Sequence, residues 1–199
     1  ASLVPAVLDT LDRYDATATF FVCTKYTVTD DVVIEQAKEL LSRGHEIGNH
    51  LEEDLSGHYS QMTSEEFGLV LDETDKALAE KLRRRVTDGD DEPSMTKWFR
   101  APQGVLTKRM SVEVEKRGMV HVLGDCYCDD WLVEDSEFVA RTMLRQARDG
   151  SVLILHMPEK CFREHCLVTL ELLLEGLSER GMRCVSLGEM MKLRCANSK

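Results

Sequence analysis

Three polar residues of this chain each follow a short strand-like segment, and the two histidines among them suit metal binding or proton transfer. His50 ends the run Gly-His-Glu-Ile-Gly-Asn-His, Arg100 opens the run Arg-Ala-Pro-Gln-Gly, and His156 closes the apolar run Ser-Val-Leu-Ile-Leu-His. Histidine can bind a metal ion or transfer a proton near neutral pH. In a β/α alternation the ends of successive strands meet on one face, where active sites lie. We therefore expect His50, Arg100 and His156 to line one pocket.

The segments that must position these residues alternate between strand and helix patterns. Helical stripes of apolar residues are expected over 3–14, 31–43, 63–84, 107–117, 135–150, 163–180 and 188–194. Strands are expected over 18–22, 45–49, 97–100, 119–123, 152–155 and 183–186. The polar stretches 51–62 and 83–94 are expected to be surface loops. This order is typical of an α/β fold with a parallel sheet covered by helices.

Composition limits the class of protein and its partners. The 199 residues are 43% hydrophobic and 31% charged, which indicates a globular chain, and we expect residues 1–199 to form one domain. A net charge of −11 argues against nucleic acid and against an anionic membrane surface as partners. No apolar run approaches the roughly 18 residues of a membrane span. We expect the seven cysteines to be reduced, partly buried thiols.

Taken in order, the short runs resemble the motifs of the polysaccharide deacetylases, the NodB-homology domain of carbohydrate esterase family 4. The resemblance extends over nearly the whole chain. It is carried by residues 16–22, 44–50 and 100–104, by Asp130-Trp131, and by Leu155-His156. One such motif is a weak signal, but several in family order are a strong one. The resemblance implies a NodB-type (β/α) barrel, distorted and seven-stranded, whose first strand is apparently lacking here.

The activity that this resemblance implies is the metal-dependent hydrolysis of an N-acetyl group from a carbohydrate. The implied partner is therefore an N-acetylated carbohydrate substrate, and the implied cofactor is a divalent metal, with zinc as the first expectation. Two alternatives stay open. One is a catalytically inactive homologue that binds carbohydrate or acts as a scaffold. The other is an amidase that acts on a small substrate, because the same barrel hosts such enzymes.

The metal site departs from the family pattern in two ways. The family opens with a strand that ends Thr-Phe-Asp-Asp-Gly-Pro, which supplies the general base and one metal ligand, and no such run occurs here. The family's His-x-x-x-His becomes His50 followed four residues later by Asp54. A carboxylate can bind zinc, although one histidine with two carboxylates favours harder divalent ions. We expect His50 and Asp54 to bind the metal, with Glu52, Glu53 and His58 as rivals to Asp54.

The resemblance also assigns roles in the proton-transfer chemistry. His156 is expected to be the general acid that protonates the leaving amine. Asp130 is expected to hold the His156 ring, with Asp129 as a competitor, and Trp131 is expected to form a wall of the pocket. His165 and Cys166, at the start of a predicted helix, are expected to serve packing alone.

The Arg-Ala-Pro-Gln-Gly run is expected to support the chemistry from its own strand end. Arg100 is expected to orient the family's carboxylate base through a charge-assisted hydrogen bond. Pro102 and Gly104 are expected to shape the turn beside the substrate, where a backbone N–H could also act as an oxyanion donor. His45 shares the motif of His50 but is expected to point away from the site as a structural residue.

Overall fold

The computed structural model describes residues 3–82 and 97–197. The predicted loop 83–94 therefore lies entirely outside the described residues. The chain divides into two compact units. We call Thr19–Leu123 the sheet unit, and Ala1–Ala18 together with Gly124–Lys199 the helical unit. Each unit is described by itself.

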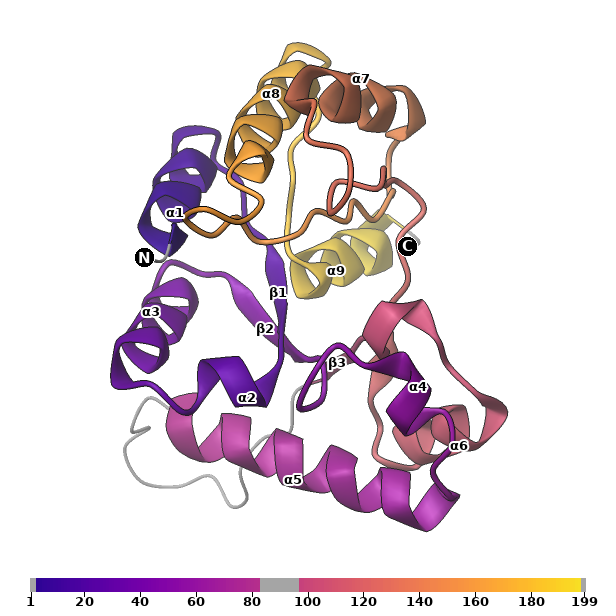
Figure 1. The fold of residues 1–199 in the computed structure, drawn as a ribbon. Helices are drawn as coiled ribbons and strands as arrows, with labels where there is room; N and C mark the ends of the chain where they lie inside the picture. The colour runs from indigo at the N-terminus through magenta and orange to yellow at the C-terminus, as the bar shows by residue number, and fades with distance from the viewer. Residues whose placement is uncertain (1–2, 83–96, 198–199) are drawn as a thin grey trace. The chain divides into compact units, whose positions relative to one another are not determined.

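The sheet unit is built on a parallel sheet of four strands. They are β1 (Thr19–Val22), β2 (Glu46–Asn49), β3 (Trp98–Phe99) and β4 (Val120–His121), and they neighbour one another in chain order (Figure 1). Each lies within a segment predicted to be a strand. The register pairs Val22 with Asn49, Asn49 with Phe99, and Phe99 with His121. These residues form one row across the sheet, and His50 follows that row directly.

Helices connect these strands and cover the sheet. They are α2 (Thr24–Thr27), α3 (Asp31–Ser42), α4 (Ser56–Tyr59), α5 (Ser64–Leu82), the 3-10 turn η1 (Pro102–Gly104) and α6 (Lys108–Lys116). The predictions of α3, α5 and α6 are confirmed. A reciprocal pair of bonds between Thr63 and Glu66 opens α5, because the backbone N–H of each residue reaches the other's side chain. The sequence analysis missed α2, α4 and η1, which are too short to show a helical period.

The core of the sheet unit fixes the distance between its helices and strands. Phe67 of α5 meets Phe99 of β3 edge to face, with ring centroids 6.2 Å apart, and both are fully buried. A second cluster joins Ile34 of α3 to Ile47 of β2. Gly48 of β2 lies against Phe21 of the neighbouring strand β1, and a Cβ at this position would come within 2.6 Å of the Phe21 ring. Side-chain packing therefore requires a glycine two residues before His50.

A buried amide sets the path of the chain as it leaves β2. Asn49 is fully buried, and its Nδ2 donates to Thr74 Oγ1 of α5 at 3.1 Å. Its Oδ1 accepts the backbone N–H of Leu51 at 2.7 Å. Leu51 has a φ of 61°, a left-handed conformation that few non-glycine residues adopt. The Asn49 side chain thus stabilises the sharp turn in which His50 lies.

The helical unit consists of α1 (Val4–Arg13), α7 (Ser136–Gln146), α8 (His165–Glu179) and α9 (Leu187–Asn197). α8 contacts both α1 and α7 (Figure 1). Asp135 caps α7 by accepting the N–H of Phe138 at 2.9 Å, as predicted. The expected end of α7 near residue 150 is wrong, because Ala147 is already extended, with φ −64° and ψ 129°.

Two predicted strands of the helical unit are wrong. Within 152–155, Leu153 forms only an isolated bridge with Cys126, and the N–H of Val152 is taken by the Asp125 side chain at 2.8 Å. Residues 183–186 also adopt no strand. There the N–H of Ser186 donates to the Thr17 hydroxyl at 2.9 Å rather than to a strand carbonyl. In each segment a side-chain acceptor takes one backbone donor that a regular ladder would use.

We expect Asn49→Ala to lower the free energy of unfolding by about 2–4 kcal/mol, since each buried polar group left without a partner costs about 1–3 kcal/mol. The control is Thr107→Ala, which removes one bond to the N–H of Met110 at the start of α6 and should cost about 1 kcal/mol. Chemical denaturation of both variants measures the difference. Equal losses would contradict a special role for Asn49.

Candidate functional site

His50 is held by one ring nitrogen at the end of β2. Its backbone N–H donates to Val22 O at 3.1 Å, and its Nδ1 lies 2.7 Å from Arg100 O. A carbonyl oxygen only accepts, so Nδ1 carries the proton and Nε2 keeps its lone pair in the neutral ring. Nε2 lies 3.5 Å from Asp54 Oδ1. The backbone carbonyl of Arg100 thus orients the ring of His50, as carbonyl oxygens do for metal-binding histidines.

Asp54 is tied to the turn that follows Arg100. Its Oδ1 accepts the backbone N–H of Gln103 at 2.8 Å. Gln103 and Gly104 both have left-handed backbones, with φ values of 52° and 72°, and Pro102 is buried. Pro102 and Gly104 both lie in this turn, and their predicted role beside the substrate stays a prediction. The turn brings a carboxylate to the side of His50.

Two of the three rivals of Asp54, Glu53 and His58, have other contacts. Glu53 pairs with Lys25 at 2.6 Å, and its backbone N–H donates to the Tyr59 hydroxyl at 3.0 Å. His58 is exposed and stacks edge to face on Tyr59, with ring centroids 5.2 Å apart. His45 is buried against Phe20, as expected for a structural residue. Proximity to His50 therefore favours Asp54 as the second ligand.

His50 and Asp54 offer a divalent metal one imidazole nitrogen and one carboxylate. A catalytic zinc site uses three protein ligands. Within residues 3–82 and 97–197, no three His, Cys, Asp or Glu side chains gather as such a group. The donor types and the orientation of His50 fit a divalent ion, but the described residues supply two ligands and not three.

Arg100 is a half-buried cation. Its Nη1 donates to Val122 O at 3.3 Å, and among the described residues it has no ion pair with a carboxylate. Burial lowers the pKa of Arg100, while the charge of Asp54 acts in the opposite direction. Burial, and then the charge of Arg100, lowers the pKa of neighbouring His121. The guanidinium therefore keeps donors available for an anion.

The helical unit holds the second group of predicted residues. Asp130 is only 2% exposed, and its Oδ1 lies 2.9 Å from His156 Nδ1. Its Oδ2 accepts the backbone N–H of His156 at 2.7 Å. The carboxylate thus places the proton on Nδ1 and leaves Nε2 as the reactive nitrogen. The structure brings Asp130, and not Asp129, to His156, and Trp131 beside it is 58% exposed.

The charge of Asp130 depends on these donors. Burial acts to raise the pKa of Asp130, but hydrogen bonds from the ring and backbone of His156 outweigh it, so the pKa lies below its ordinary value. Asp130 is therefore ionised at neutral pH and can stabilise a positively charged His156 ring.

Two residues that were expected to serve packing alone also contact Asp130. His165 Nε2 lies 2.6 Å from Asp130 O, and Cys166 Sγ lies 3.4 Å from Asp130 Oδ2. Cys166 is fully buried, as expected. Its sequence position, far from Asp130 and on an apolar helix face, carried no signal of this contact. The described residues thus form two groups, one in each unit, and the single pocket expected from the sequence stays a prediction.

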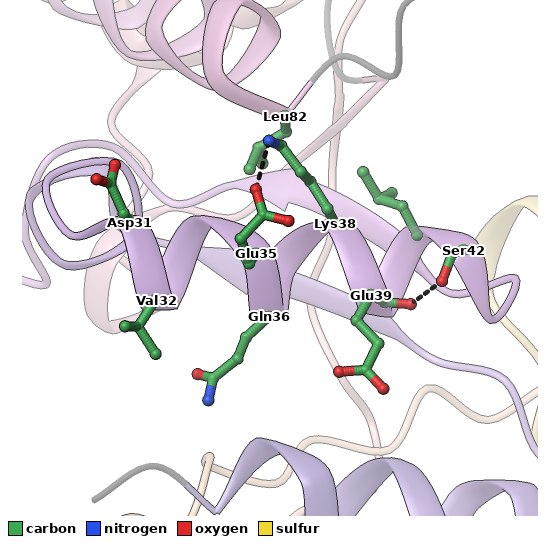
Figure 2. A pocket seen from close by; sticks show the side chains of 9 residues that line it. Asp31, Val32, Glu35, Gln36, Lys38, Glu39, Ser42 and Leu82 are labelled. Carbon is green, nitrogen blue, oxygen red and sulfur yellow. Dashed lines mark hydrogen bonds and ion pairs between the residues drawn. The ribbon is translucent and has the colours of Figure 1, made fainter.

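The sheet unit also has a surface pocket on α3. Figure 2 shows the residues of α3 that line it, together with Leu82 at the end of α5. Glu35 and Lys38 form an ion pair of 2.7 Å there. No predicted site residue lines this pocket.

No helix among the described residues is long and apolar enough to cross a membrane.

Comparisons with known proteins show the family of this chain and its fold. The sequence model named polysaccharide deacetylase matches residues 1–122. A peptidoglycan-N-acetylglucosamine deacetylase from Bacillus cereus is 27% identical over 198 residues, which cover 96% of this chain and 82% of that protein.

Two solved structures share the fold. A family 4 acetyl xylan esterase from Clostridium thermocellum, in complex with a cobalt ion, has a TM-score of 0.78 at 25% identity, with 96% of this chain and 84% of that chain covered. A CE4 family pseudoenzyme from Bacillus anthracis has a TM-score of 0.78 at 18% identity, with 94% and 59% covered. The second likeness concerns the fold alone. The predicted NodB-type α/β fold is confirmed.

We expect acid to reduce the stability that Asp130 contributes. Its pKa is lowered in the folded chain, so its contribution is complete above the unfolded pKa of about 3.9 and is lost as pH falls through the folded pKa. Wild type should exceed Asp130→Asn in free energy of unfolding at pH 7, and the gap should shrink below about pH 4. Urea denaturation across this range measures the gap. A gap that is independent of pH would contradict the assignment.

Proposed function

This chain belongs to the polysaccharide deacetylase family, and we propose that it hydrolyses the N-acetyl group of a carbohydrate with the help of a divalent metal ion. The observation that carries the proposal is that two histidine rings are oriented in the same way, each by a hydrogen bond at Nδ1. His50 and His156 are each held through Nδ1, so that Nε2 is left for chemistry. One of these nitrogens suits metal binding and the other suits proton transfer.

In the sheet unit, His50 Nε2 and Asp54 Oδ1 are the proposed metal ligands. A divalent ion at such a site lowers the pKa of water and polarises a carbonyl group. Zinc is the proposed ion, and the carboxylate in place of a second histidine makes harder ions better competitors than in a site with two histidines. The cobalt ion bound to the Clostridium thermocellum esterase supports a divalent metal in this family.

Arg100 is proposed to hold the carboxylate that acts as general base. Its half-buried guanidinium has no ion pair with any described carboxylate, which supports this role. Pro102 and Gly104 are proposed to shape the substrate side of the same turn. Their buried ring and left-handed backbone make that turn rigid.

In the helical unit, His156 is proposed to donate its Nε2 proton to the leaving amine. The Nδ1 hydrogen bond to ionised Asp130 stabilises the ring in the charged form that carries this proton. Trp131, more than half exposed, is proposed to offer its ring face to the sugar.

An inactive homologue is the second candidate. The described residues supply two metal ligands rather than three, and a CE4 family pseudoenzyme from Bacillus anthracis shares the fold. Metal binding and turnover separate the two candidates.

We expect His50→Ala to remove most of the affinity for Zn²⁺, because the imidazole is the stronger of the two proposed donors. His58→Ala is the matched control, since it removes an exposed histidine of the same loop, and its affinity should equal that of wild type. Asp54→His should increase the preference for Zn²⁺ over Mn²⁺. Titration calorimetry with each ion measures these affinities. Unchanged Zn²⁺ binding in His50→Ala would refute the metal assignment.

In the full-length protein, we expect His156→Ala to lower kcat on an N-acetylated sugar by about 10²–10⁴-fold while KM changes little, because the proton is needed only as the amine leaves. His156→Asn should lose nearly as much. An acetyl aryl ester should lose much less, since its leaving group needs no proton. Equal losses on both substrates would mean that His156 supports the fold or the metal instead.

A further inference from the structure

We propose that Cys166 and His165, adjacent residues at the start of α8, are positioning residues that lock Asp130 and thereby keep the proton of neutral His156 on Nδ1. This inference rests on the proposed function of His156, because the neutral ring needs a bare Nε2 to take up the proton that the charged ring then gives to the leaving amine. It goes beyond the Asp130–His156 pair by assigning a positioning role to two residues that contact Asp130.

The contacts of Asp130 come from two directions. His156 approaches the carboxylate with its ring at 2.9 Å from Oδ1 and its backbone N–H at 2.7 Å from Oδ2. The start of α8 provides the other two contacts. Cys166 Sγ lies 3.4 Å from Oδ2, and His165 Nε2 lies 2.6 Å from the backbone carbonyl oxygen of Asp130. Side chain and backbone of Asp130 are thus both anchored to α8.

The thiol of Cys166 is the donor in its contact with Asp130 Oδ2. Cys166 is fully buried, and burial together with the charge of Asp130 raises the pKa of the thiol to about 12. The sulfur therefore keeps its proton at neutral pH, and Oδ2 of the ionised carboxylate is the acceptor. A thiol is a weak donor. The proposed contribution of this hydrogen bond is therefore geometric: it fixes the plane of the Asp130 carboxylate that faces His156.

His165 anchors the backbone of the same residue. A carbonyl oxygen only accepts, so His165 Nε2 carries the proton in this bond. The backbone carbonyl of His165 in turn accepts the hydroxyls of Ser136 and Thr169, each at 3.0 Å. His165 therefore ties Asp130 to the starts of both α7 and α8.

The consequence for His156 concerns its tautomer. A neutral imidazole places its proton on the nitrogen that meets an acceptor. With the carboxylate held in one plane, Oδ1 stays opposite Nδ1 and Nε2 stays bare. If the carboxylate can rotate, the Nδ1 bond weakens and the Nε2–H tautomer becomes populated.

The test uses ring ¹⁵N chemical shifts of the ¹⁵N-labelled chain at a pH where His156 is neutral, with the His156 signals assigned by comparison with His156→Gln. A protonated and a bare ring nitrogen have well-separated shifts. In wild type we expect Nδ1 protonated and Nε2 bare. In Cys166→Ala the two shifts should move toward each other as tautomers mix. Cys166→Ser, which restores a donor, should keep the wild-type pattern.

Cys126→Ala is the matched control. Cys126 is as fully buried as Cys166 and lies in the same unit, but its thiol donates to Met143 O at 3.2 Å. It should show the wild-type pattern of His156. The proposal is overturned if Cys166→Ala keeps the wild-type tautomer, if Cys126→Ala mixes tautomers as much, or if Cys166→Ser behaves like Cys166→Ala.

Turnover tests the proposed function separately. In an active protein, Cys166→Ala should lower kcat about tenfold, which corresponds to about 1.4 kcal/mol of lost transition-state stabilisation, with little change in KM and with rescue by serine. If wild type shows no turnover, the proposed function fails, and the tautomer experiment still decides the role of Cys166.

Discussion

A buried carboxylate must be surrounded by hydrogen-bond donors, and Asp130 imposes this requirement on the helical unit. Moving an ionised carboxylate out of water is costly unless donors replace the lost hydration. Asp130 meets this cost with the ring and backbone of His156 and the thiol of Cys166. The residues that satisfy the charge are therefore the ones that fix the geometry of His156. Stability and proposed chemistry depend on the same bonds.

The sheet unit positions its residues by a different means. The row formed by Asn49, Phe99 and His121 aligns the ends of β2, β3 and β4. The chain leaves that row at His50 and Arg100, and a backbone carbonyl links the two residues. Backbone geometry orients the proposed metal ligand here, whereas side-chain charge orients the proposed acid in the helical unit.

Local patterns predicted the four strands of the sheet and the long helices, because the apolar periodicity and the capping residues that define them lie close together in the sequence. They failed for 152–155 and 183–186, where the side chains of Asp125 and Thr17 each accept one backbone N–H. The pairing of Asp130 with His156 followed from the family motifs. The contacts of His165 and Cys166 with Asp130 did not, since they join segments 35 and 36 residues apart through tertiary packing.

The way in which the two histidines are held has a consequence for covalent labelling. An imidazole-directed electrophile attacks an unprotonated ring nitrogen, and in both residues that nitrogen is Nε2. Selectivity then depends on access: the side chain of His156 is 37% exposed and that of His50 is 14% exposed. A bulky acylating reagent would therefore modify His156 in preference to His50, although both rings present the same atom.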